Sequence, residues 1–107
     1  MLNFLIILIL FFSNAYADSE FTQIDIIIKN HQFQPEQIEA PAGIPLRLTI
    51  YNQDDTIEEF DSPDLKREKI IPGNSFANIK LAPLKIGKYC FVGEFHADTA
   101  KGCLIIK

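Results

Sequence analysis

The sequence predicts an all-β protein built as an antiparallel β-sandwich. The first reason is a series of short segments in which apolar and polar residues alternate, as in strands with one buried face. The second is the regular spacing of turn signals between these segments, which is typical of sandwiches. In addition, no segment beyond residue 17 carries a sustained helical period with capping residues. A chain of 107 residues is long enough for one small domain of this class.

Three extended segments make up the first half of the expected sandwich. Thr22–Lys29 alternates and is rich in Ile, which predicts a strand. Residues 33–40 resume extended structure after a polar break, and Pro35 favours a sheet edge or a bulge there. Residues 44–52 form the next predicted strand, in which alternate residues share one apolar face: Leu46, Leu48 and Ile50.

The second half begins with Glu58–Ser62, a short segment whose pattern is ambiguous. Residues 65–71 form a predicted strand that ends at a Pro-Gly turn. Ser75–Leu81 alternates clearly, which predicts another strand. Residues 87–92 and 101–107 are expected to pair as a closing hairpin around a polar loop.

The N-terminal segment is expected to be a targeting signal. Residues 1–12 are almost wholly apolar, and Ala15-Tyr16-Ala17 fits the small-x-small cleavage rule. The apolar run is far short of the ~20 residues that span a bilayer. We therefore expect residues 1–17 to be a cleavable signal peptide, residues 18–107 to form the domain, and the mature protein to be periplasmic. An uncleaved anchor is the alternative, because the leader has no Lys or Arg.

Charge and motifs exclude several function classes. The net charge is −4 and the pI about 5.0, which argues against binding to nucleic acid or to an anionic membrane surface. The chain has no CxxC pair, phosphate-binding loop, glycine-rich nucleotide fingerprint or HExxH motif. No residue is therefore assigned a catalytic role.

The two cysteines, Cys90 and Cys103, are predicted to form a disulfide. An exported protein matures in an oxidising compartment, where disulfides form and persist. If Tyr89 faces the core, Cys90 faces outward, and pairing Cys90 with Cys103 also pairs Tyr89 with the inward-facing Leu104. The chain-entropy model gives a closed loop of this length roughly 3 kcal/mol of stabilisation. A register slip of one residue would separate the two sulfur atoms.

Several short motifs follow one another along the chain: Phe33-Gln34-Pro35-Glu36, Ala42-Gly43, Asn52-Gln53-Asp54, Ile71-Pro72-Gly73, Tyr89-Cys90-Phe91 and Phe95-His96. Their order resembles that of the cupredoxins, over essentially the whole of residues 18–107. More narrowly, the chain is similar to the EfeO-type cupredoxin-like proteins of the bacterial periplasm. This resemblance implies a Greek-key cupredoxin-like sandwich and an association with iron uptake through a membrane permease.

The resemblance also implies that the standard blue-copper ligands are missing. Such a site uses His, Cys, His and a weak axial Met. The first His position corresponds to Glu58, the Cys position to Gly93 and the second His to His96. The chain has no Met other than Met1. Without a thiolate at the loop position, we expect no blue-copper site.

A different metal site, made of histidine and carboxylates, is still possible on this scaffold. Glu58 and Glu59 are adjacent, so only one can face the His96 loop, and the family register favours Glu58. Imidazole and carboxylate together suit iron, manganese, zinc or Cu(II) better than Cu(I). The alternative for each residue is an ordinary solvated side chain. The candidate ligands are His31, Glu58, Glu59, Glu94, His96 and Asp98.

The resulting expectation is an exported metal-binding protein that handles copper or iron in periplasmic iron acquisition. Its partners would be the metal ion and an iron permease or another periplasmic iron-uptake protein. Two alternatives remain: a metal-free adaptor that contacts such a partner, and a copper-dependent ferroxidase. The charged run at residues 66–69 is either a solvated surface or a docking patch.

Overall fold

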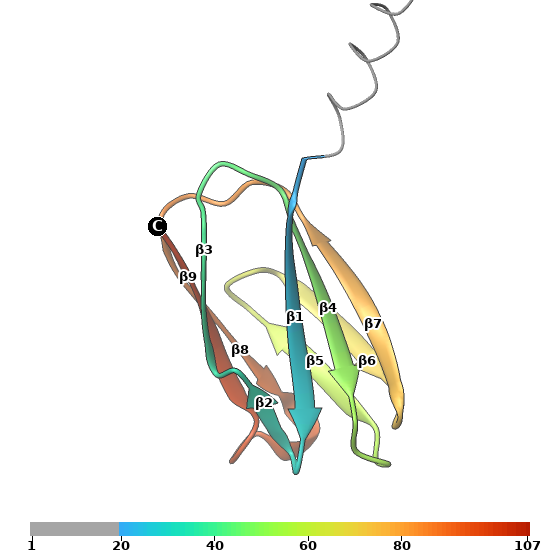
Figure 1. Ribbon diagram of the computed structural model, residues 1–107. Helices are drawn as coiled ribbons and strands as arrows, with labels where there is room; N and C mark the ends of the chain where they lie inside the picture. Colours follow the sequence, from blue (N-terminus) through green and yellow to red (C-terminus); the bar gives the residue numbers. More distant parts are fainter. Residues whose placement is uncertain (1–19) are drawn as a thin grey trace, which may run out of the picture.

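The computed structural model describes residues 20–107, which form a two-layer β-sandwich (Figure 1). The predicted signal peptide lies outside the described residues. Within residues 20–107, no helix has the length and apolarity needed to cross a membrane. The elements are β1 (Thr22–Lys29), β2 (Gln32–Gln34), β3 (Gln37–Ala40), β4 (Leu46–Asn52), β5 (Glu58–Ser62), β6 (Arg67–Ile71), β7 (Ser75–Leu81), β8 (Gly87–Gly93), the 3-10 helix η2 (Glu94–His96) and β9 (Lys101–Ile106).

The two sheets have the strand orders β2-β1-β4-β7 and β3-β9-β8-β5-β6. Most neighbours are antiparallel, as predicted, but β1 pairs with β4 and β3 pairs with β9 in parallel. The sheets are therefore mixed. Parallel neighbours need a long crossover connection, and between β1 and β4 the chain visits both sheets through β2 and β3.

Pro35 lies where the chain changes from one sheet to the other. The sequence predicted one extended segment over residues 33–40, whereas the structure divides it into β2 and β3. Both of these strands lie at the edge of their sheet. Proline has no N–H to donate to a ladder, so a position between two edge strands accommodates it well.

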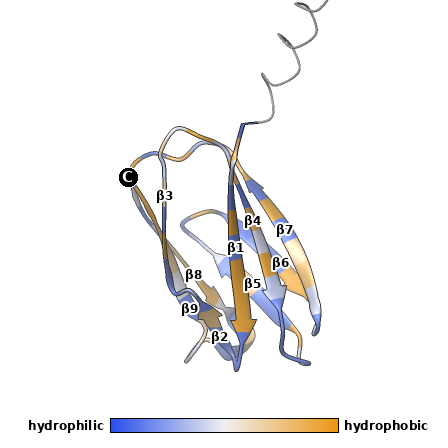
Figure 2. Ribbon diagram, viewed as in Figure 1, coloured by the Kyte–Doolittle hydropathy of each residue, from blue (hydrophilic) through white to orange (hydrophobic). Residues whose placement is uncertain are grey.

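The core lies between the sheets and is built from the predicted alternating residues. In β4, Leu46, Leu48 and Ile50 are all buried, in agreement with the predicted face. Figure 2 shows this alternation of hydrophobic and hydrophilic residues along the strands. The rings of Phe33 and Phe91 meet edge to face at 4.9 Å between centroids, and Phe60 lies 5.0 Å from Phe91. Such aromatic pairs each contribute about 0.5–1.5 kcal/mol beyond their buried area.

The closing hairpin of β8 and β9 confirms the predicted disulfide and its register. Cys90 pairs with Cys103, and Tyr89 pairs with Leu104. Phe91 and Leu104 are buried, so the cysteines lie on the face of the hairpin that points away from the core. The Cα atoms of the two cysteines are 3.9 Å apart. The disulfide therefore links neighbouring strands of the same sheet.

Candidate functional site

Three connections meet at one end of the sandwich. They are the β1–β2 turn at residues 30–31, the β4–β5 loop at residues 53–57 and the β8–β9 loop at residues 94–100. Backbone and side-chain hydrogen bonds join all three. The predicted site residues come from these connections and from the first residues of β5.

The β1–β2 turn holds His31 in a defined place. Lys29 pairs with Gln32, which leaves Asn30 and His31 as a two-residue hairpin turn. Both turn residues have positive φ, 54° and 58°, as hairpin turns of this length require. The N–H groups of Asn30 and His31 donate to the two carboxylate oxygens of Asp54, at 2.8 and 2.9 Å. The hydroxyl of Thr99 donates to the carbonyl oxygen of His31 at 2.6 Å.

Asp54 is itself fixed by the loop that carries it. Its N–H donates to Oδ1 of the buried Asn52, whose Nδ2 donates to the carbonyl oxygens of Thr56 and Ile71. Burial alone would raise the pKa of the Asp54 carboxyl. The two turn N–H groups and the nearby His31 and His96 outweigh that effect, so the pKa of Asp54 is lower than its ordinary value.

Glu58 is the most unusual residue at this end, because its carboxylate is buried. Its side chain is 1 % exposed, although it lies at the start of β5. Its Oε1 accepts hydrogen bonds from the N–H of Phe95 at 2.9 Å and from the N–H of Glu59 at 3.1 Å. Its Oε2 lies 2.7 Å from Nδ1 of His96. Three donors therefore satisfy a charge that would otherwise be costly to bury.

His96 closes η2 and is held by this contact. A carboxylate oxygen only accepts hydrogen bonds, so Nδ1 of His96 is the donor. In the neutral ring Nε2 then carries the free lone pair. The side chain is 24 % exposed, so solvent reaches it. Thr99 and Ala100 donate their N–H groups to the carbonyl oxygen of His96, which fixes the loop backbone.

The ring of His31 stacks on the ring of His96. The ring centroids are 3.6 Å apart and the planes differ by 12°. The contact of Nε2 of His31 with Oγ1 of Thr56 is long, at 3.4 Å. The structure therefore brings together Glu58 from the start of β5, His96 from the β8–β9 loop and His31 from the β1–β2 turn.

The other three predicted ligands, Glu59, Glu94 and Asp98, lie outside the cluster of Glu58, His96 and His31. Glu59 is half-buried and follows Glu58 in the strand, so it faces the opposite side. Burial raises the pKa of Glu59, and the neighbouring carboxylates of Glu68, Asp61, Glu94 and Glu58 raise it further. Glu94 and Asp98 are exposed. As the side chains of residues 20–107 are placed, no three of His, Cys, Asp or Glu gather around a point that could hold a metal ion.

A blue-copper centre does not fit these residues. A Cβ atom added at Gly93, the position that the resemblance assigns to the copper-binding Cys, would lie 2.7 Å from Cδ of Glu58 and 2.8 Å from its Oε2. It would also lie 2.7 Å from the Cβ of the buried Ala100. The Glu58 carboxylate thus fills the space that a thiolate side chain would need. Both cysteines are already joined in the disulfide.

Several residues that organise this end were not predicted to do so. Asp54, Asn52 and Thr99 hold the loops together through side-chain-to-backbone hydrogen bonds. A signal was present in the sequence, because Asn, Asp and Thr in polar loops often bond to nearby backbone. The partners, however, lie 23 and 68 residues away for Asp54 and Thr99, which local sequence does not reveal.

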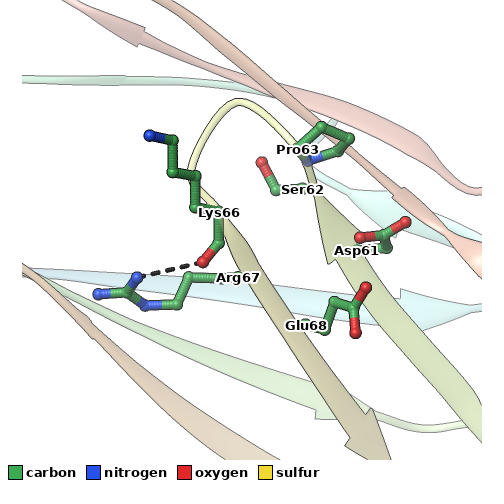
Figure 3. A pocket seen from close by; sticks show the side chains of 6 residues that line it. All are labelled: Asp61, Ser62, Pro63, Lys66, Arg67 and Glu68. Carbon is green, nitrogen blue, oxygen red and sulfur yellow. Dashed lines mark hydrogen bonds between the residues drawn. The ribbon is translucent and has the colours of Figure 1, made fainter.

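The charged run at residues 66–69 lies away from this site, at and after the turn that follows β5. It borders an open pocket of about 480 Å³ (Figure 3). Figure 3 shows Lys66 and Arg67 on one side and Asp61 and Glu68 on the other. Arg67 donates to the carbonyl oxygen of Lys66 at 3.2 Å. The mixed charges and backbone contacts are those of a solvated turn.

The sequence and the fold were compared with those of known proteins. The chain is 52 % identical over 84 residues to an uncharacterised protein of Rickettsia prowazekii strain Madrid E. This alignment covers 78 % of this chain and 67 % of that protein.

The fold resembles that of the metal-binding domain of the Cu(I)-exporting P-type ATPase CopA of Streptococcus pneumoniae D39, with a TM-score of 0.67. The two sequences are 18 % identical, and the match covers 79 % of this chain and 84 % of that chain.

Two further solved structures, a blue copper protein and a purple cupredoxin, have a similar fold. Auracyanin A of Chloroflexus aurantiacus gives a TM-score of 0.70 at 13 % identity, with 82 % of this chain and all of that chain covered. A purple cupredoxin of Nitrosopumilus maritimus gives 0.58 at 22 % identity, with 78 % and 99 % covered. The model of the cupredoxin-like domain family matches residues 2–106. The chain therefore belongs to the cupredoxin-like domain family.

Proposed function

We propose that this protein is an exported, periplasmic cupredoxin-like protein that binds a transition-metal ion, copper or iron, at His96 without blue-copper chemistry. The observation that carries the proposal is the buried Glu58 carboxylate bonded to Nδ1 of a partly exposed histidine. Histidines that bind metals almost always donate their other ring N–H to a carboxylate, a carbonyl or a water molecule. This pairing leaves Nε2 of His96 as the ligand atom.

Glu58 takes a different role in this proposal from the one the sequence suggested. The Glu58 carboxylate is buried and already accepts three hydrogen bonds, so in this proposal it orients His96 and is not counted among the ligands. Orienting carboxylates of this kind fix the tautomer and make the imidazole a better ligand. Glu94 and Asp98, each two residues from His96, are then the nearest carboxylates along the chain that could complete a coordination sphere with water.

Relatives of the same fold give this proposal circumstantial support. One neighbour is the metal-binding domain of a Cu(I) exporter and another is a blue copper protein, but at 18 % and 13 % identity they indicate the fold alone. The proposed place in iron acquisition, with an iron permease or another periplasmic iron-uptake protein as partner, rests on the resemblance to EfeO-type proteins. Nitrogen and oxygen donors suit both iron and Cu(II).

The direct test is metal titration of the purified protein, expressed from its full sequence. Cu(II), Fe(II), Fe(III), Zn(II) and Mn(II) are titrated by calorimetry, with native mass spectrometry to count bound ions. We expect one ion per chain, loss of binding in His96→Ala, and a fall of about 10–100-fold in affinity in Glu58→Gln. Glu39→Gln, an exposed carboxylate paired with Lys107 on the surface, is the matched control. A folded protein that binds none of these ions would refute the proposal.

Export is tested separately from metal binding. If residues 1–17 are a cleaved signal peptide, the measured mass of the protein from the periplasmic fraction equals that of a chain that starts at Asp18. A periplasmic protein that retains residues 1–17 would contradict cleavage. It would favour the uncleaved anchor.

A metal-free adaptor is the second candidate, and one observation favours it. The hydrogen bonds of Glu58 satisfy the buried charge internally, and the described residues do not gather three metal-binding side chains as placed. This end could therefore be stable without an ion and serve only for contact with a partner. The titration separates the two, because an adaptor remains folded and binds none of the five ions.

A further inference from the structure

We propose that the end of the sandwich opposite the candidate site docks on the surface of a bilayer that contains anionic phospholipids. The β3–β4 loop at residues 41–45 and the β7–β8 loop at residues 82–86 meet at this end, beside the start of β1 (Figure 1). The N–H of Gly43 donates to the carbonyl oxygen of Leu84 at 3.1 Å, which joins the two loops. The inference does not depend on metal binding at His96.

Basic side chains gather at this end of the molecule. Lys107 pairs with Glu39 at 3.0 Å, whereas no carboxylate of residues 20–107 forms an ion pair with the other four basic residues. Those four are exposed or partly exposed. Four cations therefore face solvent without a fixed counter-charge. The residues that define this basic end are Arg47, Lys80, Lys85, Lys88 and Lys107.

The candidate site, at the other end, has charges of the opposite sign. Its three connections, residues 30–31, 53–57 and 94–100, contain Asp and Glu but no Lys or Arg. The strand β1 has eight residues, so the two ends are about 26 Å apart at ~3.3 Å per residue. This separation exceeds the Debye length of about 8–10 Å. The net charge of −4, which argued against an anionic membrane surface, is therefore a sum over two ends that act on a membrane separately.

Arg47 and Lys80 form the part of the basic end that best suits a phosphate group. They are directly opposite each other on β4 and β7, and their neighbours Leu46 and Leu81 are buried, so both side chains point to the outer face of the sheet. Like charges in opposite positions destabilise a sheet, and a bound phosphate would relieve this repulsion. Both residues line a hollow of about 270 Å³, whose other lining residues are apolar apart from the exposed Glu20. The hollow therefore presents two cations to one anion.

Two exposed apolar side chains lie among these basic residues. Ile86 is 75 % exposed and lies between Lys85 and Lys88 in the chain. Phe21 is 42 % exposed, and the guanidinium carbon of Arg47 lies 4.5 Å from the centre of its ring. Interfacial binding to membranes combines the same two features, since cations attract the phosphates while apolar side chains enter the headgroup layer. The composition of this end therefore favours a lipid surface.

The chain that precedes the described residues joins the domain at the same end. Residue 20 lies just before β1, which starts here, so the apolar run of residues 1–12 is connected to the basic end. If the leader is removed, the basic end binds the bilayer by itself and reversibly. If the leader is kept as an anchor, the basic end is the part of the domain nearest the membrane. In both cases the candidate site points away from the bilayer.

The test measures binding of the purified protein, expressed from its full sequence, to lipid vesicles by co-sedimentation at low and at high salt. The vesicles contain either phosphatidylglycerol mixed with phosphatidylcholine or phosphatidylcholine alone. The variant that removes charge from the basic end is Lys80→Gln/Lys85→Gln/Lys88→Gln. The matched control is Lys29→Gln/Lys69→Gln/Lys101→Gln, which also replaces three exposed lysines and has the same net charge. The two variants therefore differ only in where the charge is lost.

We expect the wild type and the control to bind the vesicles that contain phosphatidylglycerol, and the binding to weaken at high salt. Each basic residue near an anionic surface contributes a factor of about five, so the basic-end variant should bind about 100-fold more weakly. The control should lose less than about fivefold.

Four results would overturn the proposal. Equal losses in the two variants would mean that net charge, and not the basic end, governs binding. Equal binding of the wild type to phosphatidylcholine alone would mean that anionic headgroups are not recognised. A folded wild type that binds neither kind of vesicle would exclude the bilayer. Self-association without vesicles that only the basic-end variant loses, seen by sedimentation velocity, would assign this end to a second copy of the chain.

Discussion

Replacing Glu58 with alanine should strongly destabilise the fold, whether or not a metal binds. The substitution removes a carboxylate that accepts three hydrogen bonds and is 1 % exposed. The N–H groups of Phe95 and Glu59 then lose their acceptor, and Nδ1 of His96 loses its partner. The strand β5 is no longer linked to η2 by a side chain.

Two estimates of the free energy of unfolding lost in Glu58→Ala agree. An unsatisfied buried donor costs about 1–3 kcal/mol, and two backbone donors are left behind. Breaking a buried hydrogen-bond network is one of the few single changes whose cost exceeds the usual range of about 0.5–3 kcal/mol. We therefore expect the free energy of unfolding to fall by about 3–5 kcal/mol, some of it recovered if water enters beside His96. A domain of this size has a total stability of roughly 4–13 kcal/mol.

Urea denaturation followed by far-ultraviolet circular dichroism is a suitable assay, because the chain has no Trp to report by fluorescence. A loss of this size corresponds to a fall in Tm of at least about 12 °C. Glu59→Ala is the matched control. Burial and nearby carboxylates raise the pKa of Glu59, so its ionised form costs stability at neutral pH and its removal should be neutral or stabilising. Equal effects of Glu58→Ala and Glu59→Ala would refute the structural role of the buried carboxylate.

Three further predictions follow from the same end of the molecule and from the hairpin. Gly93→Ala should lower the free energy of unfolding by about 1–3 kcal/mol, because the added methyl group crowds Glu58. A double-mutant cycle with Glu58→Ala should show a coupling energy of at least ~0.5 kcal/mol, and strictly additive effects would contradict the close contact. Removing the Cys90–Cys103 disulfide with the double Ser variant should lower stability by roughly 3 kcal/mol, measured by urea denaturation, and an unchanged midpoint would contradict this. Because folding lowers the pKa of Asp54, the ionised carboxylate stabilises the fold at every pH above its ordinary pKa of 3.8. This stabilisation is lost as the pH falls through the lower pKa of the folded state. Acid denaturation of Asp54→Asn should therefore lack this part of the pH dependence.

Much of the fold could be predicted from the sequence because the strands are amphipathic. Alternation placed the strands Thr22–Lys29 and Ser75–Leu81 at their observed bounds. The register of the closing hairpin followed from the same reasoning, since only one pairing kept both Tyr89 and Leu104 on the inner face and joined the cysteines. The parallel pairings could not be read in this way, because alternation reports which face is buried and not which strand lies beside it.

The candidate site was less accessible to sequence reasoning. Alternation within β5 indicated that only one of Glu58 and Glu59 could face the His96 loop, and the resemblance to the cupredoxins favoured Glu58, whose Oε2 lies 2.7 Å from Nδ1 of His96. It did not reveal that backbone N–H groups would bond to the other oxygen of Glu58, since the N–H of Phe95 reaches it only when η2 folds against β5. The stacking of His31 on His96 likewise depends on a turn that Asp54 and Thr99 hold from distant loops. Contacts of this kind come from loop closure and leave little local pattern.

Glu58 and Gly93 are best understood as one combined substitution. Considered separately in the sequence, they are two lost copper ligands: a carboxylate where a histidine is expected and a glycine where the thiolate belongs. In the structure each explains the other, because the carboxylate occupies the space that any side chain at residue 93 would need. The carboxylate also links β5 to the β8–β9 loop, through the N–H of Phe95 and the ring of His96. The two positions therefore form one hydrogen-bonded contact, and they leave one oriented imidazole, His96, partly exposed to solvent beside His31.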